Sequence, residues 1–248
     1  MIGFKDINGV FVNSDVNYIR SKHTVVGIEF NRTQKSRITL EGFLKEYSNY
    51  PISIIDQISL ANKGGGFEVL GNEAIQSLGE GKTSGLEFLF QQKLAKNFYG
   101  ILAYTYFSSE FSGLDGILRP SVWDSRHLIS FSGGYKLRKN WEISARWRYA
   151  GKNPYVPVDI NASTISYPEI ILDYDTLGEF RLDAFNLADI RIDKKWNFKN
   201  LSFNLYFEVQ NFLAQPNPTP PEYGLNRNLD GSIIIPCLLY TSPSPRDS

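Results

Sequence analysis

The sequence predicts an all-β fold in which antiparallel strands form a segment of a transmembrane β-barrel. Two observations predict this class. Long stretches alternate between apolar and polar residues, as strands do when their two faces meet different surroundings. The connections between these stretches are short and long in turn, an arrangement typical of outer-membrane barrels, which have short turns at one end and long loops at the other.

The alternation is clearest at residues 141–151, which read WEISARWRYAG. Apolar residues occupy every second position of this stretch, with charged or small polar residues between them. One face carries Trp141, Ile143, Ala145, Trp147 and Tyr149, and the other carries Glu142, Ser144, Arg146 and Arg148. An aromatic face suits lipid and a charged face suits a polar lumen, so this stretch predicts a barrel strand.

The composition is compatible with such a barrel. Hydrophobic residues make up 42% of the 248 residues, yet no run approaches the roughly 18 apolar residues that a membrane helix needs. Aromatic residues reach 14%, which suits a barrel with aromatic girdles. The formal net charge is zero, so the sequence lacks the basic surface that would indicate nucleic-acid binding.

The first half of the chain supplies four of the expected strands. Residues 24–30 alternate, with Val26, Ile28 and Phe30 on one face, and a polar turn at 31–36 leads to a strand at 37–47. A strand at 82–94 turns at 95–97 into a strand at 98–107.

The second half repeats this arrangement. Residues 126–137 turn at 138–140 into the strand at 141–151. Residues 187–198 place Trp196 with other apolar residues on one face, and the turn at 199–200 leads to a strand at about 202–210. A partial strand is expected at 233–235.

The loop lengths predict the orientation of the strands. Long connections at 48–81, 108–123, 152–184 and 213–229 are expected to be extracellular, and the short turns periplasmic. Trp141 and Trp196 each adjoin a short turn, so we expect both at the periplasmic interface, where aromatic rings prefer to lie.

Several short motifs resemble the barrel of TonB-dependent receptors from the Bacteroidota. They are GKTSGLEFLFQQKL from Gly81, FYGILAYTY from Phe98, PSVWDSRHL from Pro120, GGYK from Gly133, NWEISARWRYAGKNPYVP from Asn140, DIRIDKKW from Asp189 and LYFEVQNF from Leu205. The resemblance covers residues 25–236. It implies about eight or nine strands from the C-terminal part of a 22-stranded barrel.

The resemblance also implies a function. Such receptors lie in the outer membrane of Gram-negative cells and import a scarce nutrient (a siderophore, cobalamin, glycan or peptide) with energy from the inner-membrane TonB complex. The implied partners are outer-membrane lipid, the plug domain of the same protein, the TonB complex and the nutrient ligand. No enzyme activity, cofactor or metal is implied.

We expect the chain to be incomplete at both ends. Residues 1–236 are expected to be the barrel part, without the plug domain, and no signal peptide opens the sequence. Residues 237–248 read CLLYTSPSPRDS, which resembles a translated sequencing adapter, so we expect a non-native tail there.

Two sets of residues are candidates for the functional site. The loop aromatics best able to stack on a ligand are Tyr155, Tyr167, Tyr174 and Tyr223. The side chains expected to face the lumen and the plug are Glu87, Glu142, Arg146, Arg148, Asp189 and Arg191.

Three other functions compete with active import. A passive porin or a barrel adhesin would show the same alternation. A soluble β-sandwich would also alternate, but would need a second apolar sheet to cover these aromatics. Asp124, Ser125 and His127 lie close together as in a hydrolase, although an extended strand turns Asp124 away from the other two. His23 has no Cys or second His nearby, so metal-ligand spacing is absent.

Overall fold

The computed structural model describes residues 5–63, 72–166, 169–221 and 228. Strands dominate them, and the strand bounds are β1 Arg20–Thr33, β2 Ser36–Ser53, β3 Ile75–Ala95, β4 Phe98–Ser112, β5 Leu118–Pro120, β6 His127–Lys136, β7 Trp141–Ala150, β8 Phe185–Asn197 and β9 Ser202–Val209. The helical elements are short: 3-10 turns η1 (Leu60–Asn62), η2 (Arg138–Asn140) and η3 (Tyr174–Thr176), and helix α1 (Ile160–Ile165). The predicted all-β class is therefore confirmed.

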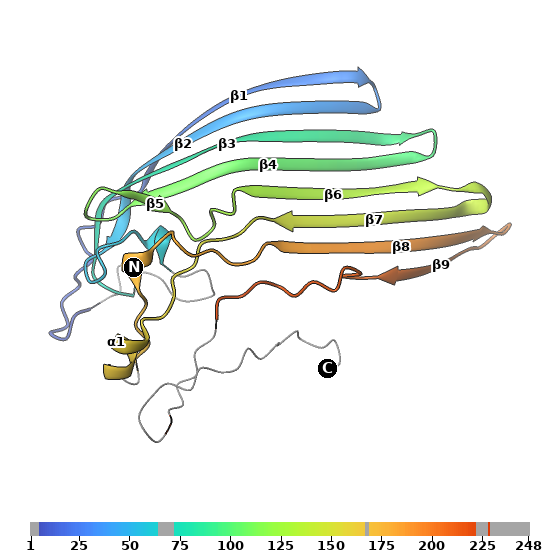
Figure 1. The fold of residues 1–248 in the computed structure, drawn as a ribbon. Coiled ribbons are helices and arrows are strands. Elements are labelled where there is room, and N and C mark those ends of the chain that lie inside the picture. Colours follow the sequence, from blue (N-terminus) through green and yellow to red (C-terminus); the bar gives the residue numbers. More distant parts are fainter. Residues whose placement is uncertain (1–4, 64–71, 167–168, 222–227, 229–248) are drawn as a thin grey trace.

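All the strands belong to one antiparallel sheet. Its order is β1-β2-β3-β4-β6-β7-β8-β9, and β5 pairs with β4. Each long strand thus lies beside its neighbour in sequence, as in an up-and-down barrel wall. The short turns gather at one end of the sheet, and the long connections, η1 and α1 gather at the other (Figure 1). These two ends are called the turn end and the loop end below.

The tight turns depend on residues that tolerate left-handed backbone. Lys96 and Asn97 at the β3–β4 turn have φ of 47° and 76°, and Lys139 and Asn140 at the β6–β7 turn both have φ of 58°. Asn adopts this region more easily than most residues, because its short side chain can bond locally. The turns at 95–97 and 138–140 lie where the sequence predicts them.

Several strands continue further toward the loop end than expected. β2 runs to Ser53 and β3 begins at Ile75, so both ends of the loop expected at 48–81 are strand. Pro51 interrupts the alternation in sequence, but it pairs with Ser77 after a register shift between Tyr47 and Tyr50. The sequence hides this extension because a bulge shifts which residues face which side.

The loop expected at 108–123 is also partly strand. β4 continues to Ser112 at its start, and β5 adds a short strand in its middle. β5 is only three residues long and pairs with the end of β4, so it gives no periodic signal. The partial strand expected at 233–235 and the tail expected at 237–248 lie outside the described residues.

The buried apolar residues lie mainly at the loop end. Buried hydrophobic side chains of the described part are Ile52, Ile58, Leu60, Ala61, Ile75, Phe107, Phe111, Leu177 and Ala188. Most of them belong to the loop ends of β2–β4 and to the connections beside them. Together these form a packed region at the loop end, called the loop cap below. Along β1 and β9, by contrast, nearly every residue is exposed, including the large apolar side chains. Within the described residues, no helix has the length and apolar character needed to cross a membrane.

Candidate functional site

The strand register separates the sheet into a polar face and an apolar face. Residues directly opposite each other on neighbouring strands point to the same side. One row of such pairs runs Glu41, Glu87, Thr105, Leu128, Ala150, Phe185 from β2 to β8. The next row runs Glu29, Thr39, Leu89, Ala103, Ser130, Arg148, Leu187 from β1 to β8. Both rows belong to the polar face.

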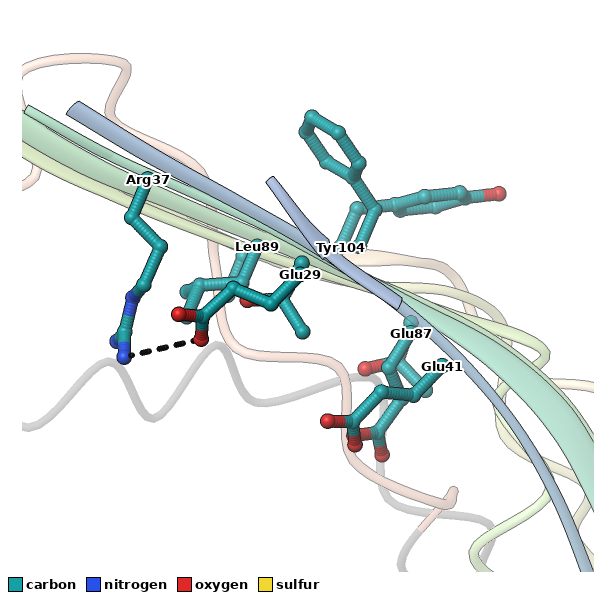
Figure 2. Close-up of a pocket in the computed structure, with 10 residues that line it drawn as sticks. Glu29, Arg37, Glu41, Glu87, Leu89 and Tyr104 are labelled. Atoms are coloured by element: carbon teal, nitrogen blue, oxygen red, sulfur yellow. Dashed lines mark ion pairs between the residues drawn. The ribbon is translucent and has the colours of Figure 1, made fainter. Parts of the chain in front are cut away.

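Carboxylates gather on the polar face of β1–β3. Glu41 and Glu87 are cross-strand partners, and they border a cavity of about 290 Å³ with Glu29, Arg37 and Thr105. Figure 2 shows these acidic side chains on one side of the sheet and Tyr104 on the other. Arg37 Nη1 lies 3.6 Å from Glu29 Oε2, so Glu29 has a partner within the sheet. Glu41 and Glu87 form no ion pair or hydrogen bond with another described residue.

Three of the predicted lumen-facing residues have hydrogen-bond partners among the described residues. Glu142 accepts a hydrogen bond from the Tyr99 hydroxyl, which lies over Gly134. Asp189 Oδ1 accepts from the backbone N–H of Asn211 at 2.9 Å. The Arg191 guanidinium contacts Asp193 through two hydrogen bonds of 2.7 and 2.8 Å.

Arg146 and Arg148 differ from Arg191 in their ion pairing. The register places both on the polar face, where Arg146 pairs with Ser132 and Asp189, and Arg148 with Ser130 and Leu187. Neither forms an ion pair with a described residue. Beside Arg148 the polar face has an apolar hollow of about 350 Å³.

At the loop end a buried carboxylate joins two connections. The Asp124 side chain is fully buried, and its Oδ2 lies 2.8 Å from Arg126 Nε and 2.9 Å from Arg181 Nη2. Its Oδ1 accepts from the backbone N–H of Ser109 at 2.8 Å. Arg181 also donates to the backbone carbonyls of Asp124 and Lys152, so it ties the β7–β8 connection to the β4–β6 connection. This network escaped the sequence analysis because its members are far apart in the chain.

A second charged cluster stabilises the connection between β2 and β3. Lys63 Nζ donates to Asp56 and, at 2.7 Å, to Glu73 Oε1, and Ser53 also donates to Glu73. Burial alone would lower the pKa of Lys63, but the hydrogen bonds to Asp56 and Glu73 outweigh it and raise that pKa above its ordinary value. The cluster therefore keeps Lys63 charged.

The two predicted loop tyrosines that the structure describes have different partners. Tyr155 packs against Phe180 with ring centroids 6.1 Å apart, and Tyr174 has the Lys63 ammonium 5.9 Å from its ring centroid. Both are partly buried within the connection that follows β7. Tyr167 and Tyr223 lie outside the described residues.

An aromatic cluster that the sequence analysis missed lies on the polar face at the loop end. Phe111 packs on Tyr50 and Tyr47 with centroids 4.4 and 5.4 Å apart, and Trp123 packs edge-on against it at 5.8 Å. A Cβ at Gly81 would lie 2.3 Å from the Phe111 ring, so this glycine makes room for the ring. Only the strand extensions beyond Tyr47 and Phe107 bring these rings together.

The rival hydrolase arrangement does not form. Asp124 is committed to its two arginines, while His127 Nδ1 lies 2.9 Å from the Tyr104 hydroxyl on the apolar face. Ser125 is buried next to Asp124. Among the residues that the structure describes, no three His, Cys, Asp or Glu side chains are grouped so that they could hold a metal ion.

At the turn end, the apolar face carries the two predicted interface tryptophans. Trp141 begins β7 and Trp196 lies near the end of β8. Lys194 Nζ lies 5.2 Å from the Trp141 ring centroid and 5.5 Å from that of Trp196, and it donates to the Lys139 carbonyl. A lysine held between aromatic rings at a strand end is typical of a membrane–water interface.

Comparison with known proteins agrees with this architecture. Residues 3–212 match the family described as "TonB dependent receptor-like, beta-barrel". Among solved structures, the ferripyoverdine receptor of the outer membrane of Pseudomonas aeruginosa is 15% identical with a TM-score of 0.59, covering 93% of this chain. The ferric-catecholate import receptor Fiu from E. coli K12 is 15% identical with a TM-score of 0.56, covering 82%.

The chain spans only 27% of the Pseudomonas receptor and 24% of the E. coli receptor. At this identity the likeness concerns the fold alone. A search of curated proteins gave no match.

Proposed function

The chain belongs to the TonB-dependent receptor β-barrel family, and from this premise we propose that it forms part of the barrel wall and ligand-facing loops of a receptor for active nutrient uptake. The observation that carries the proposal is a single antiparallel sheet with one apolar and one charged face, and with its long connections gathered at one end. Receptors of this family are outer-membrane barrels, so we place this chain in the outer membrane of a Gram-negative cell.

The apolar face suits contact with lipid. Val26, Ile28, Phe30 and their counterparts on β9 are more than a third exposed, and water would penalise such a surface. The Trp141–Lys194–Trp196 group then marks the periplasmic boundary of the bilayer. The loop cap, with its buried Asp124 network, lies at the opposite, extracellular end.

The charged face suits contact with a plug domain. Glu41 and Glu87 face each other without a cation from the described chain, and like charges at directly opposed positions are stabilised by a nearby cation. A basic side chain of the plug would supply it. We therefore propose that Glu87, with Glu41, contacts the plug, and that Glu142, Asp189 and Arg191 shape the wall through contacts with its own residues.

The ligand is proposed to be a nutrient of the siderophore, cobalamin, glycan or peptide class, bound at the loop end. The P. aeruginosa receptor is known bound to ferripyoverdine, and the E. coli receptor imports ferric catecholates. Tyr155 and Tyr174 remain candidate contacts, and Trp123 joins them because its side chain is 45% exposed and packs on Phe111 at the loop end. Tyr167 and Tyr223 stay proposals on sequence grounds.

The decisive experiment uses the complete receptor that contains this segment, expressed in a Gram-negative host with and without a functional TonB complex. Cell-associated uptake is measured for ferric pyoverdine, cobalamin, a glycan oligomer and a peptide, each labelled. We expect uptake of one class, abolished by loss of TonB. Uptake that persists without TonB would indicate a passive porin, and surface binding without uptake of any class would indicate an adhesin.

A further inference from the structure

We infer that the hollow beside Arg148 is a binding subsite for a compact organic anion, such as the carboxylate of a single aromatic ring. The inference rests on the proposed import function and adds the chemistry that one part of the wall recognises. It concerns a place on the sheet whose lining includes neither Tyr155 nor Tyr174.

The hollow results from the sizes of the side chains in the two cross-strand rows. Where the rows cross β4, β6 and β7, every side chain except Arg148 is small or aliphatic, and the carboxylates of β1–β3 are absent. A cavity of about 350 Å³ results, which adjoins the acidic cavity at Ala103 and Thr105. Its lining on the polar face is Ala103, Thr105, Leu128, Ser130, Arg148, Ala150 and Phe185.

Arg148 is the cation of this hollow, and it has no acidic partner among the described residues. Arg191 is a contrasting arginine of the polar face, because Asp193 binds it through two hydrogen bonds. It lies on β8, two positions from the cross-strand partner of Arg146. An arginine beside apolar surface gains most from a planar anion that accepts two parallel hydrogen bonds. A carboxylate attached to a small apolar body satisfies both the guanidinium and the lining.

The position of the hollow favours a ligand over the plug. Ala150 ends β7 and Phe185 begins β8, so the hollow opens at the loop end, beside the connection that starts at Gly151. The acidic cavity extends the other way, to Arg37 near the turn end of β2. At about 350 Å³ the hollow is at the small end of ligand pockets, which limits its occupant to about one ring with its carboxylate.

The test measures binding of 4-(trifluoromethyl)benzoate to the complete receptor in detergent by fluorine NMR, with the neutral 4-(trifluoromethyl)benzamide as the matched probe. We expect the benzoate to bind the unmodified receptor at least tenfold more tightly than the amide. Arg148→Gln should weaken benzoate binding about tenfold, and Arg148→Lys should weaken it less, since the charge remains. Arg146→Gln, which removes an unpaired arginine of the same face outside the hollow, should leave binding unchanged.

Ala150→Leu gives a second, independent test, because it fills the hollow and keeps the charge. We expect it to abolish benzoate binding, and heat-dependent migration on gels verifies that each variant is folded. Equal effects of the Arg146 and Arg148 variants, equal binding of benzoate and amide, or binding only after deletion of the plug would each overturn the inference. Since binding needs no TonB, TonB-dependent uptake without benzoate binding would refute this subsite and leave the import function standing.

Discussion

Glu41 on β2 and Glu87 on β3 lie directly opposite each other on the polar face, and neither carboxylate has a cationic partner in the described part of the chain. Like charges at directly opposed positions destabilise an antiparallel pair by a few tenths to about 1 kcal/mol. A Cβ at Gly27 would lie 2.6 Å from Glu41 Cγ, so Glu41 lies across the glycine of the neighbouring strand. The pair is thus a local cost that an outside cation would offset.

From this pair we predict that the double variant Glu41→Gln/Glu87→Gln weakens attachment of the plug without weakening the barrel. The plug cation loses charge-assisted hydrogen bonds of about 1.5–3 kcal/mol, while the wall loses a repulsion. Urea titration of the complete receptor should show a lower midpoint for plug unfolding and an unchanged or higher midpoint for the barrel. Glu29→Gln is the control, because Arg37 already pairs with that carboxylate. An equal effect of the control would contradict the prediction.

The strand pattern was predictable wherever two faces meet unlike surroundings. Residues 141–150 alternate because one side faces charges and the other an apolar surface, and β7 has these bounds almost as predicted. The same period places Arg146 and Arg148 on the polar face. Alternation is a local property, so it can be read from neighbouring residues alone.

The loop cap was not predictable, because its contacts join residues that are not close neighbours in the sequence. Asp124 and Arg181 are separated by 57 positions, and Lys63 lies seven positions from Asp56 and ten from Glu73. Their pairing depends on how long connections fold over the strand ends, which carries no periodic signal. The aromatic cluster at Phe111 depends likewise on a bulge after Tyr47 that shifts the register.

Asp124→Asn is predicted to open the loop cap locally. The substitution weakens two buried contacts with arginine, and breaking such a buried pair typically costs about 3–5 kcal/mol. Trypsin treatment of intact cells should then cleave after Arg126 or Arg181 faster than in the unmodified receptor, while the barrel stays folded. Asp115→Asn, which breaks the more exposed pair with Arg119, should change cleavage little, because such pairs contribute about 0–1 kcal/mol. Unaltered cleavage of the Asp124 variant would show that the Asp124 network does not hold the two connections together.

The Lys63 cluster predicts loss of order in its connection at high pH. The folded-state pKa of Lys63 is raised above its ordinary value by hydrogen bonds from its ammonium to Asp56 and Glu73, which outweigh burial. The stabilisation is therefore complete below the unfolded pKa of about 10.4 and is lost as the pH rises through the raised value. Proteolysis of the connection at residues 54–63 should stay constant from pH 7 to about 9 and rise above about 11. Lys63→Met should remove this pH dependence, and a rise already complete at pH 9 would refute the assignment.

The two faces of β8 are predicted to respond differently to a charge reversal at its turn end. Lys194 lies on the apolar face between Trp141 and Trp196, whereas its neighbour Lys195 pairs with Asn204 on the polar face. Lys194→Glu removes two cation–π contacts of about 0.5–1 kcal/mol each and places a carboxylate near the Lys139 carbonyl that Lys194 now contacts. Lys195→Glu makes the same charge change toward the lumen, where water can solvate it.

We expect the first variant to lower barrel stability in lipid vesicles by about 1–2 kcal/mol and the second to leave it within about 0.5 kcal/mol. Unfolding in urea, followed by heat-dependent migration, measures both, and Lys194→Met distinguishes loss of the cation from gain of the anion. Equal destabilisation by the Lys194 and Lys195 variants would contradict the assignment of one face to lipid and the other to the lumen. Only that difference in surroundings would make the same charge reversal cost more at one position than at its neighbour.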